Sequence, residues 1–184
     1  WDENDQPGAW STASFETGLA QADWQGVWVC PETEEPDIDC TDAINAFAKP
    51  NWEQKQAALE ASCKGQVQPY QPHRPASYLR KAFTAPAGES KRLYITAKGL
   101  YTAWLNGKRV GDMVLAPGSF TADKHLGAQT YDVTVLVHPG ENELLIALGD
   151  GWYRSTSGVD GDRDLFGKEL AVLFQLEVDG KAVC

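Results

Sequence analysis

Short stretches of alternating apolar and polar residues fill most of the chain from residue 77 onward. Because successive side chains of a strand point to opposite faces, this period of two predicts β-strands. The predicted strands lie in SYLRKAFT, KRLYITAKGLYTAWLNGKRVGD, QTYDVTVLV, ENELLIALGDGWY and KELAVLFQLEV. Short strands at regular spacing, separated by turn residues, indicate a mainly β fold, either a β-sandwich or a jelly roll.

The Asn106-Gly107 dipeptide predicts a tight hairpin within the longest of these stretches. Both central residues of a type I′ turn need a positive φ, which asparagine and glycine adopt most readily. The last residues, DGKAVC, begin another hairpin arm. We therefore expect the chain to be cut from a larger β domain at its C-terminus.

The first 18 residues combine a turn signal, DQPG, with an extended stretch that contains Trp10 and Phe15. A lone strand and turn cannot fold by themselves, so we expect this segment to be the tail of a preceding domain. The stretch ADWQGVWVCP then predicts a short strand through its alternating apolar residues.

Residues 31–66 differ from the rest of the chain, because acidic residues and prolines occupy the first half and a helical pattern the second. NWEQKQAALEASCKG is the strongest helix signal. Asn51 can cap this helix, Gln54 stands at the reciprocal capping-box position, and Gly65 can end it. We predict a short helical insertion that packs against the β domain and has a structural role.

The composition narrows the function classes. A chain of 184 residues with 42% hydrophobic and 23% charged residues is typical of one globular domain. The net charge of -10 argues against nucleic acid and against an anionic membrane surface, because phosphates need a clustered basic face. No stretch of ~20 apolar residues predicts a membrane span, and the N-terminus lacks the pattern of a signal peptide.

The four cysteines, Cys30, Cys40, Cys63 and Cys184, follow no C-x-x-C spacing, which argues against a zinc or thioredoxin-like site. In an exported protein three pairings are open. Cys40 with Cys63 is favoured because these residues bracket the insertion, and closing that loop stabilises it by ~3 kcal/mol. The alternative is four free, half-buried thiols.

The stretch LGDGWYRS places Trp152 just beyond the end of an apolar run. Gly149 and Gly151, on either side of Asp150, permit sharp backbone turns and predict a loop at the edge of the sandwich. An indole there with polar neighbours is typical of a carbohydrate site, since the apolar face of a sugar stacks on the ring. The alternative is an aromatic residue that covers the end of the sandwich.

The loop GVDGDRDLFG carries Asp160, Asp162 and Asp164 at alternate positions, a spacing that can converge carboxylates on a calcium ion. Leu165 takes the glycine place of an EF-hand and no glutamate closes the loop, so a solvated loop is the alternative. We find no catalytic motif: the three histidines lie far apart, and the sequence contains no Gly-x-Ser-x-Gly, His-Glu-x-x-His or phosphate loop. No catalytic residue is therefore nominated.

Residues 78–178 resemble the N-terminal accessory domain of bacterial α-L-rhamnosidases of glycoside hydrolase family 78. The matching stretches, in order, are YLRKAF, ITAKGLYTAWLNGKRVGDMVLAPG, QTYDVT, GENELLIALGDGWYRSTSG and GKELAVLFQLEVDG. The resemblance implies a galactose-binding-like β-jelly roll over residues 77–184, a linker strand with the helical insertion over 19–76, and the tail strand of a fibronectin-like domain over 1–18.

In that family some members bind L-rhamnose on this domain through calcium and an exposed tryptophan, while catalysis resides in a separate (α/α)6 barrel. By this resemblance Trp152 stacks on the sugar, and Asp150 and Arg154 take its hydroxyl groups. Asp123 matches an acidic residue that helps to hold calcium or the sugar. Lys124 stands where an amide would be useful, and its positive charge opposes a calcium site.

Two functions are therefore open. The first is a rhamnose-binding module within a secreted or periplasmic α-L-rhamnosidase that hydrolyses terminal α-L-rhamnosyl residues. The second is a purely structural domain that packs on the catalytic barrel of the same polypeptide and has no ligand of its own. Exposure of the Trp152 ring discriminates between them, because a buried ring cannot stack on a sugar.

Overall fold

The computed structural model describes residues 3–13, 15–32, 75–155 and 164–184, and this part of the chain is mainly β. Its strands are β1 (Ser77–Ala85), β2 (Lys91–Lys98), β3 (Leu100–Leu105), β4 (Lys108–Arg109), β5 (Gln129–Asp132), β6 (Gly140–Gly149), β7 (Ala171–Val178) and β8 (Lys181–Ala182). A 3-10 turn, η1 (Gln21–Asp23), precedes them, and a four-residue helix, α3 (Gly151–Arg154), follows β6. No helix in these residues is long and apolar enough to cross a membrane.

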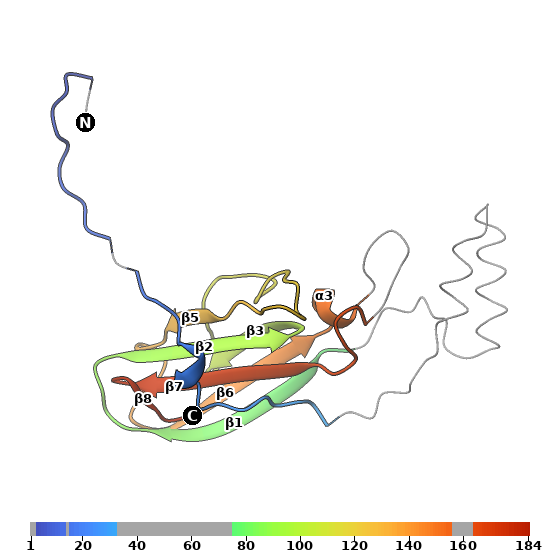
Figure 1. Ribbon diagram of the computed structural model, residues 1–184. Helices are drawn as coiled ribbons and strands as arrows, with labels where there is room; N and C mark the ends of the chain where they lie inside the picture. Colours follow the sequence, from blue (N-terminus) through green and yellow to red (C-terminus); the bar gives the residue numbers. More distant parts are fainter. Residues whose placement is uncertain (1–2, 14, 33–74, 156–163) are drawn as a thin grey trace, which may run out of the picture.

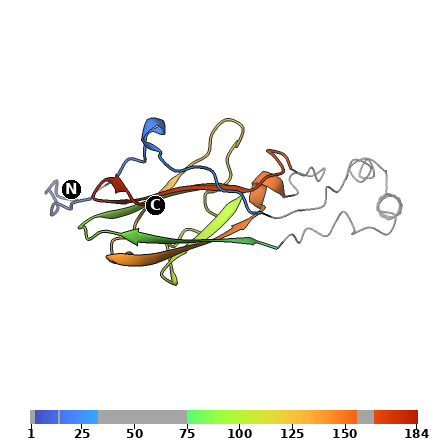
Figure 2. The same cartoon turned by 90° about the horizontal axis from the view of Figure 1, so that it is seen from below.

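The strands form two antiparallel sheets of four strands each, which lie face to face as two layers (Figure 1). Sheet I has the order β1-β6-β3-β4, and sheet II has the order β5-β2-β7-β8. Figure 2 shows the two layers from the side, with the N-terminal part of the chain on the outer side of sheet II. The predicted mainly β sandwich is therefore confirmed.

The core lies between the two sheets and is built from the inward-facing residues of the long strands. Along β6 the buried residues alternate with half-buried ones, so Leu144, Ile146 and Leu148 all face sheet II. In sheet II, Leu93 of β2 lies directly opposite Leu176 of β7, and both are fully buried. Burying each such side chain stabilises the fold by about 1.5–3 kcal/mol. Every second residue of a strand faces the core, so apolar residues at these positions give the period of two seen in the sequence.

The predicted hairpin joins β3 and β4, and Asn106 and Gly107 adopt φ values of 50° and 78°. The pair Asp179 and Gly180 makes the same kind of turn between β7 and β8, with φ values of 50° and 73°. Positive φ at both central residues matches the right-handed twist of the strands that they connect. Both hairpin predictions are confirmed.

The N-terminal segment (residues 15–32) joins sheet II at the edge of β7. Val29 and Val172 exchange two backbone hydrogen bonds of 2.9 Å, but this isolated bridge is all that forms of the strand predicted for ADWQGVWVCP. Further along this segment, the backbone N–H of Gln25 donates to the side chain of Gln175 at 2.6 Å instead of to a strand carbonyl.

Residues 3–13 and 15–18 contain no strand, so the extended edge predicted around Trp10 and Phe15 does not pair with either sheet. Both rings are more than 90% exposed. An extended segment becomes a strand only where its backbone groups find a partner.

The predicted helix at residues 51–65 and the favoured Cys40–Cys63 pair lie outside the described residues. The other two cysteines, Cys30 and Cys184, are free thiols. The assignment of 1–18 to a preceding fibronectin-like domain, and of 19–76 to a linker with an insertion, stays a prediction.

Candidate functional site

Trp152 lies on α3, at the end of the sandwich where β6 finishes (Figure 1). Gly151 begins this helix with a φ of +51°, and a Cβ there would collide with the side chain of Leu100 on β3. Glycine is therefore needed for the chain to turn this closely over sheet I. Trp152 is 41% exposed, so part of its surface is open to solvent and the rest packs against the described chain.

A narrow cavity lies beneath Trp152, between α3 and the rim loop (residues 117–128). Aromatic and aliphatic side chains fill its walls, among them Phe120, Leu126 and Phe166. The volume that remains is about 10 Å³, which is near the room that one water molecule needs. A sugar therefore finds no pocket under the ring, and only the exposed surface of Trp152 offers it a stacking face.

Asp150 and Arg154 are brought together at this end of the sandwich, as an ion pair within one turn. The Nε and Nη2 atoms of Arg154 donate to Asp150 Oδ1 at 2.9 and 2.7 Å, and Nη1 donates to the backbone carbonyl of Lys168 at 3.0 Å. The two side chains are only 7% and 12% exposed, Arg154 being the more buried. This pair fixes α3 to the chain that leads into β7. Its predicted contact with sugar hydroxyls stays a prediction.

Asp123 lies in the rim loop, next to Ala122, which lines the cavity together with Trp152. Its carboxylate is 54% exposed, and Lys124 Nζ lies 3.3 Å from Asp123 Oδ2. The structure thus places Asp123 at the same end of the molecule as Trp152, in contact with solvent. An exposed carboxylate with a lysine ammonium beside it can bind a hydroxyl group, but it is a poor calcium ligand.

The second candidate metal site can be followed only in part. Asp160 and Asp162 lie outside the described residues. Asp164 lies within them, in a turn where its carbonyl accepts a hydrogen bond of 3.0 Å from the backbone of Gly167. In the described part of the chain no three His, Cys, Asp or Glu side chains come together to hold a metal ion. The residues that are described do not fit calcium, and calcium binding by the acidic loop stays a prediction.

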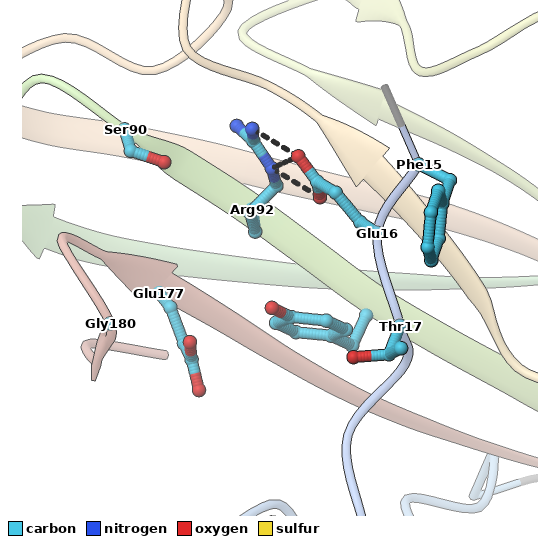
Figure 3. Close-up of a pocket in the computed structure, with 8 residues that line it drawn as sticks. Phe15, Glu16, Thr17, Ser90, Arg92, Glu177 and Gly180 are labelled. Atoms are coloured by element: carbon cyan, nitrogen blue, oxygen red, sulfur yellow. Dashed lines mark hydrogen bonds and ion pairs between the residues drawn. The ribbon is translucent and has the colours of Figure 1, made fainter. Parts of the chain in front are cut away.

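Sequence reasoning missed a larger concave site on the outer face of sheet II. This sheet-face cleft has a volume of about 470 Å³, and its lining includes Phe15, Glu16, Ser90, Arg92, Tyr94 and Glu177 (Figure 3). The alternation along β2 and β7 could have placed three of these side chains on one face. No sequence signal indicates that residues 15–17 cross that face, because this depends on contacts between segments about 75 positions apart.

The charged groups of the sheet-face cleft hold one another in place. Arg92 Nε donates to the two carboxylate oxygens of Glu16 at 2.9 and 2.7 Å, and Arg92 Nη1 lies 3.1 Å from Asp132 Oδ1 (Figure 3). The hydrogen bond from Arg92 lowers the pKa of Glu16, and the hydroxyl of Thr134 lowers the pKa of Asp132. Burial raises the pKa of the Tyr94 phenol, so this group is a neutral hydroxyl at physiological pH.

Known proteins resemble this chain over most of its β region. The family model for the α-L-rhamnosidase N-terminal domain matches residues 87–182. An α-L-rhamnosidase of Streptomyces avermitilis is 45% identical over 106 residues, which cover 56% of this chain and 10% of that protein. One of Formosa agariphila is 32% identical over 162 residues, which cover 86% of this chain and 14% of that protein.

A solved structure agrees with these matches. The crystal structure of the Streptomyces avermitilis α-L-rhamnosidase complexed with L-rhamnose is 35% identical, with a TM-score of 0.55 over 82% of this chain and 15% of that one. The present chain thus spans only 10–15% of the length of these relatives.

Proposed function

The chain belongs to the α-L-rhamnosidase N-terminal domain family, and from this premise we propose that it is a non-catalytic, carbohydrate-binding part of an α-L-rhamnosidase. The parent enzyme hydrolyses terminal α-L-rhamnosyl residues, and its catalytic domain lies outside this chain. The names of the relatives support this assignment, as does the lack of a catalytic motif in the sequence. The proposed ligand is L-rhamnose, with which one relative has been crystallised.

The observation that carries the proposal is the exposed Trp152 ring on a rigid support. The ring is 41% exposed, and its helix is held by the Asp150–Arg154 ion pair and by the close contact at Gly151. Because the helix that carries the ring is held in place, stacking of a ligand does not require this backbone to become ordered. Asp123, exposed on the adjacent rim loop, supplies a carboxylate for a sugar hydroxyl.

A specific observation also favours the structural alternative. Asp150 and Arg154 are bound to each other, and the cavity under Trp152 has room for about one water molecule. If another domain of the parent enzyme covers the Trp152 ring, this end of the sandwich serves as a docking face. In that case the rim has no ligand site of its own.

The test is a titration of the chain with L-rhamnose, in calcium and in EDTA, followed by two-dimensional NMR of the tryptophan indole signals. We expect the Trp152 signal to shift with saturation, and Trp152→Ala to weaken binding of L-rhamnose at the rim by tenfold or more. Trp10→Ala is the matched control, because Trp10 is fully exposed in a segment without strands. An unchanged Trp152 signal in all arms contradicts the carbohydrate-binding proposal, and a shift only with calcium supports an ion in the site.

A further inference from the structure

The sheet-face cleft lies far from the Trp152 rim. Its floor is at the start of β2 and the end of β7, whereas α3 and the rim loop lie beyond the other end of β2. Tyr94 of the cleft and Gly99 of the rim cavity are five positions apart along the chain, which corresponds to about 16 Å of extended backbone. A ligand in the cleft therefore makes no contact with the indole, and the two places can be tested separately.

We propose that the sheet-face cleft is a second binding site, which takes a neutral, hydroxyl-rich ligand of the size of one or two sugar rings. The volume of about 470 Å³ lies within the range of small-molecule sites. This site goes beyond the proposed function, since it uses other residues on another face of the sandwich.

The cleft has a fixed floor. Arg92 and Glu177 lie opposite each other in the register of β2 and β7, and Tyr94 lies opposite Gln175 in the next outward-facing pair. Gln175 is 1% exposed although it points away from the core, because the N-terminal segment covers it. Its amide donates to the carbonyl of Asp23 at 3.3 Å and to Glu177 Oε1 at 2.7 Å. The carboxylate of Glu177 is thereby oriented by its neighbour on the strand.

The N-terminal segment forms one wall of the cleft and is attached to sheet II at two points. Glu16 is bound to Arg92 at one end, and Figure 3 shows residues 15–17 lying over the strands at that point. At the other end Trp24 packs edge-on against Tyr94, with ring centroids 6.5 Å apart. Two anchors on one short segment keep the cleft open without a ligand, so binding does not have to order the chain.

The lining favours a neutral ligand with many hydroxyl groups. Ser90, Thr17 and Tyr94 supply hydroxyls, the carboxylate of Glu177 accepts hydrogen bonds, and the Phe15 ring is 91% exposed at the edge. This combination of an aromatic face and several polar groups is the chemistry that recognises a saccharide.

The charges of the cleft disfavour an anion. Arg92 is paired with the carboxylates of both Glu16 and Asp132, and Glu177 adds a further negative charge. An anion would have to compete with these carboxylates, within a chain whose net charge is -10. The negative charge around Arg92 attracts cations, so the titration includes a cationic probe.

The experiment is an NMR titration of the isotope-labelled chain with three probes: L-rhamnose as the neutral one, galacturonate as the anion and argininamide as the cation. We expect L-rhamnose to shift the amide signals of Arg92, Tyr94 and Glu177 with saturation at millimolar concentration. Glu177→Gln should weaken this binding about tenfold, because it replaces a charged acceptor and leaves the shape unchanged. Tyr94→Phe, which retains the ring against Trp24, should also weaken it.

Trp152→Ala is the matched control, and it should leave the shifts in the cleft unchanged. Cleft signals that do not move with L-rhamnose, that move equally in Glu177→Gln, or that respond more strongly to a charged probe would overturn the proposal. The Trp152 indole is observed in the same spectra. Failure of the cleft and failure of the rim therefore give different results.

Discussion

The Trp152 rim and the sheet-face cleft use polar residues in opposite ways. At the rim, Asp150 and Arg154 are buried and bound to each other, and a ligand meets the partly exposed Trp152 and the exposed Asp123 instead. In the cleft, Arg92 and Glu177 are partly exposed and line an open volume of about 470 Å³. The rim is suited to contact with a flat face, and the cleft is suited to partial enclosure.

The difference shows that polar residues next to an aromatic ring do not by themselves make a binding site. Charged side chains close to α3 stabilise the backbone that presents Trp152, whereas those on the outer face of sheet II remain accessible because strand geometry points them outward. Substitutions in the Asp150–Arg154 ion pair should therefore have the largest effect on stability. Substitutions at Trp152 and in the cleft should mainly change ligand affinity.

The largest expected effect is at Arg154. Arg154→Met removes one member of a buried pair and leaves Asp150 with an uncompensated charge, which should lower the free energy of unfolding by about 3 kcal/mol in urea denaturation. Arg80→Met is the matched control, because the Arg80 side chain is 73% exposed and should change stability by less than about 0.5 kcal/mol. The double variant Asp150→Leu/Arg154→Met should recover most of the loss, and equal losses in the single and double variants would contradict a paired role.

The second largest expected effect on stability is at Gln175, whose side chain attaches the N-terminal segment to β7. Gln175→Ala leaves the backbone groups of Asp23 and Gln25 without their partner, and it should cost about 1–3 kcal/mol. Limited proteolysis should then cut within residues 15–32 sooner than in the unchanged chain. Gln21→Ala, at an exposed position of η1, should leave the cleavage rate unchanged. Equal protection in Gln175→Ala would show that other contacts hold the segment.

The third effect concerns binding rather than folding. Trp152→Ala should weaken binding of L-rhamnose by tenfold or more, equivalent to about 1.4 kcal/mol, in isothermal titration calorimetry. The same substitution should lower the melting temperature only moderately, because Trp152 is 41% exposed and only the rest of its surface packs against the rim cavity. A large loss of stability together with unchanged affinity would favour the structural alternative for the rim.

The smallest effect is the response of the N-terminal segment to acid. The pKa of Glu16 in the folded chain lies below its ordinary value of 4.5, because Arg92 donates hydrogen bonds to the carboxylate. This contact is therefore fully formed above pH 4.5 and is lost as the pH falls through the lowered pKa.

The amide signals of Phe15 and Thr17 should report this loss in an NMR pH titration. Glu16→Gln should remove most of the change, while Asp132, whose pKa is also lowered, accounts for a remainder at Arg92. An identical titration curve in Glu16→Gln would show that this pair does not attach the segment.

Local patterns correctly predicted where the strands of the described β region lie and the turn at Asn106-Gly107. Two of the predicted strands were too long, because QTYDVTVLV is a strand only over Gln129–Asp132 and the end of ENELLIALGDGWY forms α3. Burial alternates along β6 because its inward residues meet the opposite sheet, and that alternation is visible in the sequence. The position of Trp152 at the end of the apolar run was also predicted, but its exposure was left open, because an indole there can stack on a sugar or cover the end of the sandwich. The predicted strand at ADWQGVWVCP was wrong except for the bridge at Val29, and the backbone N–H of Gln25 donates to the side chain of Gln175 instead of to a strand.

The sequence by itself determined the layered β architecture and the place of the indole at the end of the sandwich, because both follow from side-chain periodicity and turn chemistry within about ten residues. Only the tertiary structure decided that Asp150 and Arg154 bind each other, and that residues 15–17 form one wall of a cleft over β2 and β7. These features depend on contacts between segments that are far apart in the sequence. Such contacts set the burial and the hydrogen-bond partners of a polar side chain. A local sequence pattern contains no information about these long-range contacts.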